Sequence, residues 1–188
     1  MNIITIADLL ELCELAKTED HRDPYLLQLP WGQAPYYNFL FLLTNQMKPD
    51  FIVELGVSRG TGTANLSAGA PTAHICGVDI NLGSKDVELN LFPSVDLHEG
   101  DSMDYLHTII QPHGKPCIDL LFIDTDHTTE QCLKEYRGYL PYMRKGGIVL
   151  FDDIFMEGMS GVWPAIAEPK VILLDLHAHL GFGAAIIE

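Results

Sequence analysis

Residues 51–69 read FIVELGVSRGTGTANLSAG, a short apolar run followed at once by three glycines within seven positions. The run Phe51–Leu55 has the length and composition of a buried strand. Gly56, Gly60 and Gly62 let the chain turn tightly and let a ligand approach the main chain. A helix that begins after them would point free N–H groups at a carboxylate or a phosphate. The stretch therefore predicts a strand, a ligand-binding loop and a helix in succession.

Short apolar runs alternate with helix-length segments through the rest of the chain. The runs that predict strands are Phe51–Leu55, His74–Ile80, Val95–His98, Ile118–Asp124, Gly147–Phe151, Val171–Leu176 and Phe182–Ile187. The segments that predict helices are Thr5–Lys17, Tyr36–Met47, Thr61–Ala68, Met103–Ile110, Thr128–Met143 and Gly161–Ala167. Continuous apolar runs are typical of strands buried on both faces of a parallel sheet. Only HAHLG joins the last two runs, which is too short for a parallel crossover, so we expect them to pair antiparallel.

These elements predict an α/β fold of the Rossmann-like, doubly wound kind. We expect a mostly parallel seven-stranded sheet with an antiparallel last strand. A chain of 188 residues suits one domain, with residues 1–49 as an N-terminal helical cap and residues 50–188 as the ligand-binding core. In such a sheet the ligand lies at the carboxyl ends of the strands.

The composition narrows the class of partner and the compartment. A net charge of -15 disfavours nucleic acid and membrane surfaces, because both are anionic. No run reaches the length of about 18 apolar residues that a membrane span needs, and the first residues do not resemble a signal peptide. The four cysteines are widely spaced without a CxxC pair, which is typical of reduced thiols. We expect a cytoplasmic protein with a small-molecule partner, and a homodimer remains open.

Acidic residues follow most of the predicted strands. Asp79 lies about 20 residues beyond the glycines, where an acid can accept hydrogen bonds from ribose hydroxyls, and a solvated acid at the end of the strand is the alternative. Asp101 could accept from an adenine amino group or could cap the helix that follows it. Asp124 and the pair Asp152 and Asp153 end the fourth and fifth strands. Apolar strands that end in carboxylates are costly unless these groups face a ligand, a metal or water.

The glycine loop alone leaves more than one cofactor open. A phosphate-binding P-loop is excluded, because no lysine follows the glycines at the required spacing. The spacing of Gly56, Gly60 and Gly62 matches the GxxxGxG of short-chain dehydrogenases, but none of the seven tyrosines has a lysine four residues later. A nicotinamide-dependent oxidoreductase is therefore the less favoured alternative.

A set of ordered motifs resembles the class I methyltransferases that use S-adenosylmethionine (SAM). The motifs are Glu54 before the glycines, Asp79, Gly100-Asp101-Ser102, the run Ile118–Asp124 and the stretch LPYMRKGGIVLFDD. The resemblance spans about residues 50–188 and is strongest to small O-methyltransferases with a DxDH turn after the fourth strand. It implies methyl transfer from SAM to a small molecule, most readily at a hydroxyl oxygen. A SAM-binding protein without turnover is the alternative.

The resemblance also implies roles for individual residues. Those assigned to the cofactor are Glu54, Gly56, Gly60 and Gly62 for the methionine end, Asp79 for the ribose, Asp101 and Ser102 for the adenine, and Asp124 near the methyl donor. In metal-dependent relatives an aspartate and an Asp-Asn pair hold a divalent cation, and Asp124, Asp152 and Asp153 stand at the matching positions. Such oxygen ligands favour Mg²⁺, Ca²⁺ or Mn²⁺. Asp152 and Asp153 could instead form a capping turn without a metal.

His127 stands where those relatives have a lysine base. A histidine titrates near neutrality and can accept a hydroxyl proton, although a structural role at the turn is the alternative. His177 and His179 could reach a metal, but we favour solvent-facing or packing roles. The side chains that could wall an acceptor pocket are Trp31, Tyr36, Tyr37, Phe155, Met156, Met159 and Trp163, and packing in the core is the simpler explanation for them.

Overall fold

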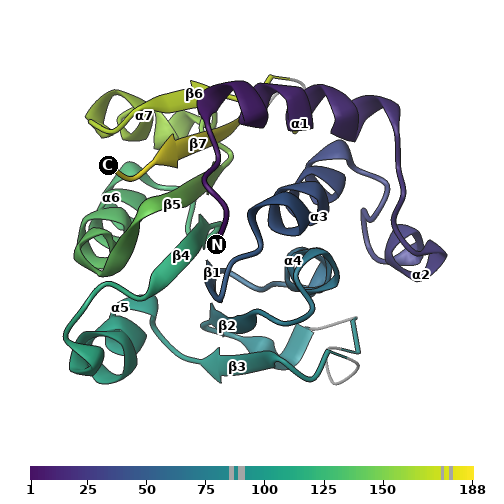
Figure 1. The fold of residues 1–188 in the computed structure, drawn as a ribbon. Coiled ribbons are helices and arrows are strands. Elements are labelled where there is room, and N and C mark those ends of the chain that lie inside the picture. The colour runs from purple at the N-terminus through teal and green to yellow at the C-terminus, as the bar shows by residue number, and fades with distance from the viewer. Residues whose placement is uncertain (85–86, 89–91, 175, 178–179) are drawn as a thin grey trace.

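A seven-stranded sheet forms the centre of the molecule in the order β3-β2-β1-β4-β5-β7-β6 (Figure 1). The computed structural model describes residues 1–84, 87–88, 92–174, 176–177 and 180–188. The strands are β1 (Phe51–Leu55), β2 (His74–Asp79), β3 (Val95–Glu99), β4 (Ile118–Ile123), β5 (Met143–Asp152), β6 (Lys170–Ile172) and β7 (Phe182–Ile186). Strands β1 to β5 pair parallel, and β7 runs antiparallel to both β5 and β6. The predicted α/β class and the antiparallel last strand are confirmed.

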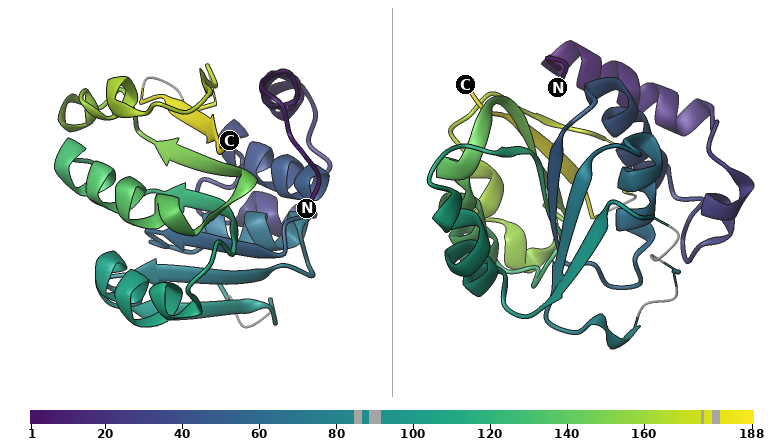
Figure 2. Two further views of the ribbon diagram at one scale, coloured as in Figure 1. Left: turned by 60° about the vertical axis from the view of Figure 1, so that its left-hand side comes forward. Right: turned by 60° about the horizontal axis from the view of Figure 1, so that its bottom comes forward.

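Helices cover both faces of this sheet. They are α1 (Ile6–Thr18), α2 (Pro24–Gln28), α3 (Pro35–Met47), α4 (Thr61–Gly69), α5 (Ser102–Tyr105), α6 (Thr129–Tyr139) and α7 (Val162–Ala165). Single turns of other helix types lie at Leu82–Ser84, Leu106–Ile110, Gln111–His113, Leu140–Tyr142 and Glu157–Met159. Figures 1 and 2 show α1, α3 and α4 on one face and α5, α6 and α7 on the other. Two large apolar clusters fill the two interfaces, which explains why the strands read as continuous apolar runs.

The segment before β1 packs on the sheet through the helix layer. Thr5 and Asp8 form the capping box that starts α1, and α3 packs against both α1 and α4. The buried guanidinium of Arg22 donates a hydrogen bond of 2.8 Å to the Asn65 side chain in α4. Arg22 also pairs with Asp20 at 2.6 Å. These contacts fix the stretch around α2 beside the glycine loop.

The predicted boundaries of four elements are wrong, and local chemistry explains the first. The helix predicted over Thr128–Met143 ends at Tyr139, because Pro141 has no N–H for the helical hydrogen bond. Strand β5 then begins at Met143, four residues before the predicted start. Strand β6 spans only Lys170–Ile172, and α7 only Val162–Ala165, so both are shorter than predicted.

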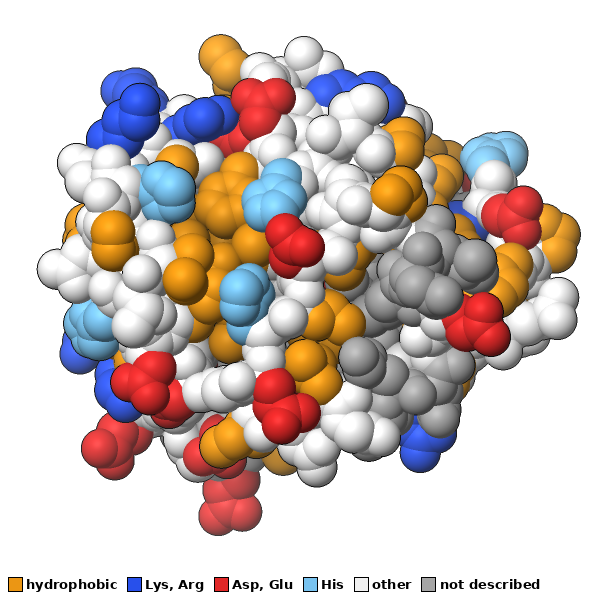
Figure 3. Space-filling model, turned by 90° about the horizontal axis from the view of Figure 1, so that it is seen from below, with side chains coloured by type: hydrophobic (Ala, Val, Ile, Leu, Met, Phe, Trp, Pro, Cys, Tyr) orange, Lys and Arg blue, Asp and Glu red, His pale blue; other side chains and the backbone are white. Residues whose placement is uncertain are grey.

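The surface and the cysteines agree with the composition. The face on the β3 side of the molecule carries acidic and histidine side chains among apolar ones, with Lys and Arg toward its margin (Figure 3). The four cysteines are free thiols, and three of them are buried. Across the described residues, every helix is too short or too polar to span a bilayer.

Candidate functional site

A cavity of about 900 Å³ opens at the carboxyl ends of the parallel strands. Its walls come from the loops that follow β1, β2, β3, β4 and β5, from the segment between α2 and α3, and from the connection between β6 and β7. The residues predicted to form the site that line it are Glu54, Gly56, Gly62, Asp79, Asp101, Ser102, Asp124, His127, Asp152 and Asp153. Gly60 is the N-cap residue of α4 and lies between the lining residues Arg59 and Thr61.

The glycine loop allows close approach at two points. Gly56 has a φ of 90°, and a Cβ there would collide with the carbonyl oxygen of Asp124. The amide of Asp124 donates a hydrogen bond of 2.8 Å to Leu55, so the loop after β1 and the end of β4 lie backbone against backbone. Gly62 lies over Glu54, and a Cβ at Gly62 would collide with Glu54 Oε1. Gly56 therefore requires glycine, because its clash is with backbone and its φ is positive, whereas a side chain at position 62 would force the Glu54 carboxyl group to move.

Glu54 is a buried acid at the base of the cavity, with a residue exposure of 1%. The hydroxyl of Thr63 in α4 donates a short hydrogen bond to Glu54 Oε2. Burial raises the pKa of Glu54 to about 8, although the Thr63 hydrogen bond opposes the rise, and the charges of Asp124 and Asp79 add to it. The free protein therefore holds a largely protonated carboxyl group here at neutral pH.

Asp79 fixes the shape of the loop after β1. Its Oδ2 accepts hydrogen bonds from the amides of Val57 (2.8 Å) and Ser58 (2.7 Å), and its Oδ1 accepts from the amide of Asn81 at 2.8 Å. Ser58 has a φ of 48°, a left-handed conformation that these bonds hold in place. Sequence reasoning considered Asp79 as a ribose-binding acid or a solvated acid and missed this contact with the loop.

Asp101 and Ser102 have different partners. Asp101 caps α5 by accepting hydrogen bonds from the amides of Met103 (2.8 Å) and Asp104 (3.2 Å), so the capping alternative is confirmed. The Ser102 hydroxyl instead donates to the buried Glu135 at 2.6 Å.

Glu135 joins three walls of the cavity and was missed by sequence reasoning. It accepts hydrogen bonds from Ser102, from the Thr125 hydroxyl at 2.7 Å and from Gln131 at 2.8 Å. One pattern in the sequence does mark Glu135 as unusual. Glu135 lies on the same helix face as the apolar residues Cys132 and Tyr139, where a lone acid is unusual.

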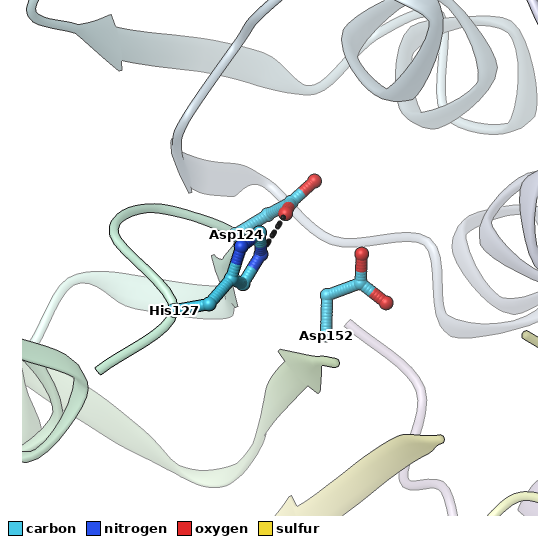
Figure 4. A group of neighbouring side chains, drawn as sticks. All are labelled: Asp124, His127 and Asp152. Carbon is cyan, nitrogen blue, oxygen red and sulfur yellow. Dashed lines mark hydrogen bonds and ion pairs between the residues drawn. The ribbon is translucent and has the colours of Figure 1, made fainter. Parts of the chain in front are cut away.

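Three acids and two histidines form a cluster at the ends of β4 and β5. His127 Nε2 lies 3.2 Å from Asp124 Oδ1 and 3.3 Å from Asp153 Oδ2. His177 Nδ1 lies 2.8 Å from Asp152 Oδ1 and 3.1 Å from Asp153 Oδ1. Figure 4 shows His127 bonded to Asp124, with Asp152 facing them from the end of β5. The acids and histidines thus alternate, and Asp153 contacts both histidines.

The charged groups in this cluster shift one another's pKa values. Burial raises the pKa of Asp124, and its hydrogen bond to His127 opposes the rise. The same hydrogen bond raises the pKa of His127 above its usual range. Asp152 and then Asp153 raise the pKa of His177 to about 10. At neutral pH the free protein therefore holds positive charge on His177.

Two groups of three could hold a metal ion with one atom from each residue. They are Asp124, His127 and Asp152, and Asp152, Asp153 and His177, and in each group the candidate atoms lie within 4.8 Å of one another. The sequence placed Asp124, Asp152 and Asp153 together, and all three do lie in the cluster. His177 was expected to face solvent or to pack, whereas it contacts both acids of β5. His179 lies outside the described residues.

Three of the seven side chains predicted to wall an acceptor pocket lie in the cavity lining. Trp31, Tyr36 and Tyr37 line the cavity, and the guanidinium of Arg59 in the glycine loop lies 5.0 Å from the centre of the Trp31 ring. Burial raises the pKa of Tyr37 to about 12. The other four predicted wall residues lie outside the lining: Met156, Met159 and Trp163 belong to an apolar core cluster, and Phe155 is half exposed.

Comparisons with known proteins agree with this geometry. The family described as a methyltransferase domain matches residues 53–154. Uncharacterized protein R132 of Acanthamoeba polyphaga mimivirus is 26% identical over 145 residues, which is 69% of this chain. The matched region spans 64% of the length of that curated relative.

Solved structures show the same fold at low identity. A putative O-methyltransferase from Klebsiella pneumoniae superposes with a TM-score of 0.68 at 21% identity, covering 97% of this chain and 89% of that one. The O-methyltransferase TomG from Streptomyces achromogenes, solved with SAM, superposes with a TM-score of 0.69 at 18% identity, covering 100% of this chain and 93% of that one. An O-methyltransferase from Bacillus cereus, solved with S-adenosylhomocysteine (SAH), superposes with a TM-score of 0.67 at 18% identity, covering 97% of this chain and 90% of that one.

The family match covers more than half of the chain. It includes the last three residues of β1, the glycine loop, Asp79, the Asp124–His127 turn and the two acids at the end of β5, Asp152 and Asp153. The chain therefore belongs to the methyltransferase-domain family and has the class I methyltransferase fold.

Proposed function

We propose that this protein transfers a methyl group from SAM to a hydroxyl oxygen of a small molecule. The observation that carries the proposal is the cavity in which the glycine loop, the buried Glu54 and the acid–histidine cluster meet. Family membership and two structures of the same fold, solved with SAM and with SAH, support it. SAM supplies a methyl group activated by a positively charged sulfonium.

The residues present fit that cofactor. A volume of about 900 Å³ lies within the usual range for small-molecule sites. Aspartates from the ends of four strands line the cavity, and an acid-lined site favours a cation. In this proposal Glu54 and the loop glycines, Gly56, Gly60 and Gly62, hold the methionine end, where the first amides of α4 attract its carboxylate.

The nucleoside end would lie against the loops after β2 and β3. A carboxylate has about four acceptor positions, and Asp79 uses three for loop amides. One position remains for a ribose hydroxyl. Asp101 uses Oδ1 for both helix-capping bonds, which leaves Oδ2 for an adenine amino group. Ser102, held by Glu135, would frame the same ring from the next position.

A divalent cation could be held by the carboxylate oxygens of Asp124, Asp152 and Asp153, because such oxygens have the right donor chemistry. Carboxylate oxygens are ligands for Mg²⁺, Ca²⁺ and Mn²⁺, and the buried Oδ1 of Asp153 lies 3.1 Å from the His177 imidazole. A bound cation would stabilise negative charge on the acceptor oxygen.

His127 is the proposed base. It lies in the cavity wall and contacts Asp124 at 3.2 Å, an arrangement in which the acid orients the imidazole and stabilises its protonated form. Since Asp124 also raises the pKa of His127, the neutral and active form grows with pH. We therefore expect kcat/KM to rise with pH through the pKa of His127.

Transfer of a labelled methyl group tests the proposal. SAM with a deuterated methyl group is incubated with matched hydroxyl, amine and thiol acceptors, and the products are identified by mass spectrometry. We expect label on hydroxyl acceptors, loss of transfer in His127→Asn, and unchanged transfer in His21→Asn, an exposed histidine paired with Glu19. Label on amines or thiols alone would contradict oxygen transfer. SAM binding without transfer to any acceptor would favour the non-catalytic alternative.

A further inference from the structure

Gln131 lines the cavity beside the buried Glu135, and the proposed function gives it no role. It lies in the first turn of α6, and its side chain contacts Ser102 at the start of α5. Helices α5 and α6 lie next to each other on one face of the sheet (Figure 1). The Gln131 carboxamide therefore lies beside the loop after β3, against which the adenine of the cofactor is proposed to bind.

Glu135 fixes which way the Gln131 carboxamide points. Gln131 Nε2 donates to Glu135 Oε1 at 2.8 Å and approaches Ser102 Oγ at 3.4 Å. The hydroxyls of Ser102 and Thr125 also donate to Glu135, so three donors converge on this carboxylate and it acts only as an acceptor. Turning the carboxamide over would place Gln131 Oε1 against the carboxylate oxygens, and two acceptors repel each other. Glu135 is 0% exposed, so solvent does not screen this repulsion.

One donor and one acceptor of the Gln131 carboxamide remain for a ligand. Glu135 Oε1 and Ser102 Oγ lie only 2.6 Å apart, so a single N–H of Gln131 Nε2 serves both. Among the residues that the structure describes, the carboxamide makes no other hydrogen bond. Its second N–H and its Oε1 are therefore left, next to each other on one planar group in the cavity wall.

The edge of an adenine base matches this pair of groups. Its exocyclic amino group donates and the ring nitrogen beside it accepts, and a glutamine carboxamide can bind both at once. The amino group has two N–H, so Asp101 Oδ2 and Gln131 Oε1 can each accept one. Hypoxanthine carries a carbonyl oxygen in place of the amino group, which would face Gln131 Oε1 acceptor to acceptor. A free carboxamide could turn over to suit hypoxanthine, but Glu135 holds this one in the orientation that suits adenine.

We propose that Gln131 selects the base of the cofactor by binding the exocyclic amino group of adenine and the ring nitrogen beside it. Glu135 is then a positioning residue, because it sets the direction of the Gln131 carboxamide without touching the ligand. The inference rests on the proposed function, since it concerns the base of the same cofactor. The opposing explanation is that Gln131 only completes the hydrogen bonds of Glu135 and contacts no ligand.

Calorimetric titrations of the full chain with SAH and with S-inosylhomocysteine, which carries hypoxanthine in place of adenine, test the inference. The measured quantity is the ratio of the two Kd values. Gln131→Met keeps the length of the side chain and removes both polar atoms, and Gln131→Ala is a second variant at the same half-buried position. Glu135→Gln supplies a group that donates as well as accepts, so it lets the Gln131 carboxamide turn over. Gln111→Met, at an exposed glutamine bonded to His107, is the matched control, and thermal unfolding shows that each variant is folded.

We expect the wild type to bind SAH more tightly than S-inosylhomocysteine by at least about tenfold, the size of effect that such a pair of contacts gives between bases. Both Gln131 variants should reduce this ratio by at least about fivefold, because they weaken SAH binding. Glu135→Gln should also reduce it, because it strengthens binding of S-inosylhomocysteine, and Gln111→Met should leave it unchanged. A purely structural role of Gln131 would change both Kd values by the same factor and keep the ratio.

The same titrations separate this inference from the proposed function. A smaller preference for SAH in the wild type, or a smaller change of the ratio in the folded Gln131 variants, would overturn the inference, and SAH binding would leave the proposed function standing. An unchanged ratio in Glu135→Gln would overturn the positioning role of Glu135. Failure of the folded wild type to bind SAH would overturn the proposed function and the inference with it.

Discussion

The Glu54→Gln substitution tests the buried acid beneath the glycine loop. Burial raises the pKa of Glu54 to about 8, against 4.5 for an exposed glutamate. Because the folded protein keeps this proton to a higher pH than the unfolded chain does, the contribution to stability is complete below pH 4.5. It is lost as the pH rises through 8.

The two pKa values set the size of the loss. They differ by about 3.5, and each pKa unit is worth about 1.4 kcal/mol. The free energy of unfolding should therefore fall by on the order of 4 kcal/mol between pH 5 and pH 9 on account of this group. Glutamine cannot ionise, and its carbonyl oxygen can still accept from the Thr63 hydroxyl, so the variant should not show this part of the decline.

The assay is urea unfolding followed by circular dichroism at five pH values from 5 to 9. Other groups titrate in both proteins, so the quantity of interest is the difference between wild type and Glu54→Gln at each pH. We expect the free energy of unfolding of Glu54→Gln, relative to that of the wild type, to increase steadily with pH. Glu11→Gln, at an exposed position of α1, should run parallel to the wild type. A constant difference between Glu54→Gln and the wild type would refute the reasoning and mean that Glu54 is ionised in the folded protein.

Three further substitutions test other parts of the account. Glu135→Gln removes one of two carboxylate oxygens that accept from Ser102, Thr125 and Gln131, and should lower the free energy of unfolding by about 2 kcal/mol in urea titrations. An equal loss in the exposed Lys134→Gln would count against this. Gly62→Ala places a methyl group against Glu54 Oε1. It should lower the free energy of unfolding by about 1–3 kcal/mol and weaken SAH binding in calorimetry. Unchanged affinity for SAH would contradict the steric argument. Asp119→Asn weakens the ion pair of the buried Asp119 with the partly exposed Arg144, at residues outside the cavity lining, so it should destabilise the fold by about 2 kcal/mol yet leave SAH affinity unchanged once folded.

The sheet and the position of the site could be predicted because each depends on local sequence. Strands buried on both faces give apolar runs, and the carboxyl ends of parallel strands meet at one edge of the sheet. Asp79, Asp124 and Asp152 could therefore be placed at one cavity from their positions after strands, without knowing the strand order.

Contacts between distant segments could not be predicted in the same way. His177 reaches Asp153 only because β7 pairs with β5 in a given register, and a shift of one residue would turn alternate side chains to the other face. Glu135 looked like an ordinary helix acid until its three donors were in place. The role of Asp79 in holding the loop depends on the left-handed backbone of Ser58, which sequence does not require of a serine.

Calorimetric titration with SAH tests the central claim most directly, because the proposed activity requires this cavity to hold the cofactor. Wild type is compared with Asp79→Ala, which removes the acceptor of three loop amides and the proposed acceptor of the ribose, and with Asp96→Ala, whose exposed acid lies on β3. We predict binding in the micromolar range, about -8 kcal/mol, that weakens at least tenfold in Asp79→Ala and is unchanged in Asp96→Ala. Absence of binding by the folded wild type would contradict the account.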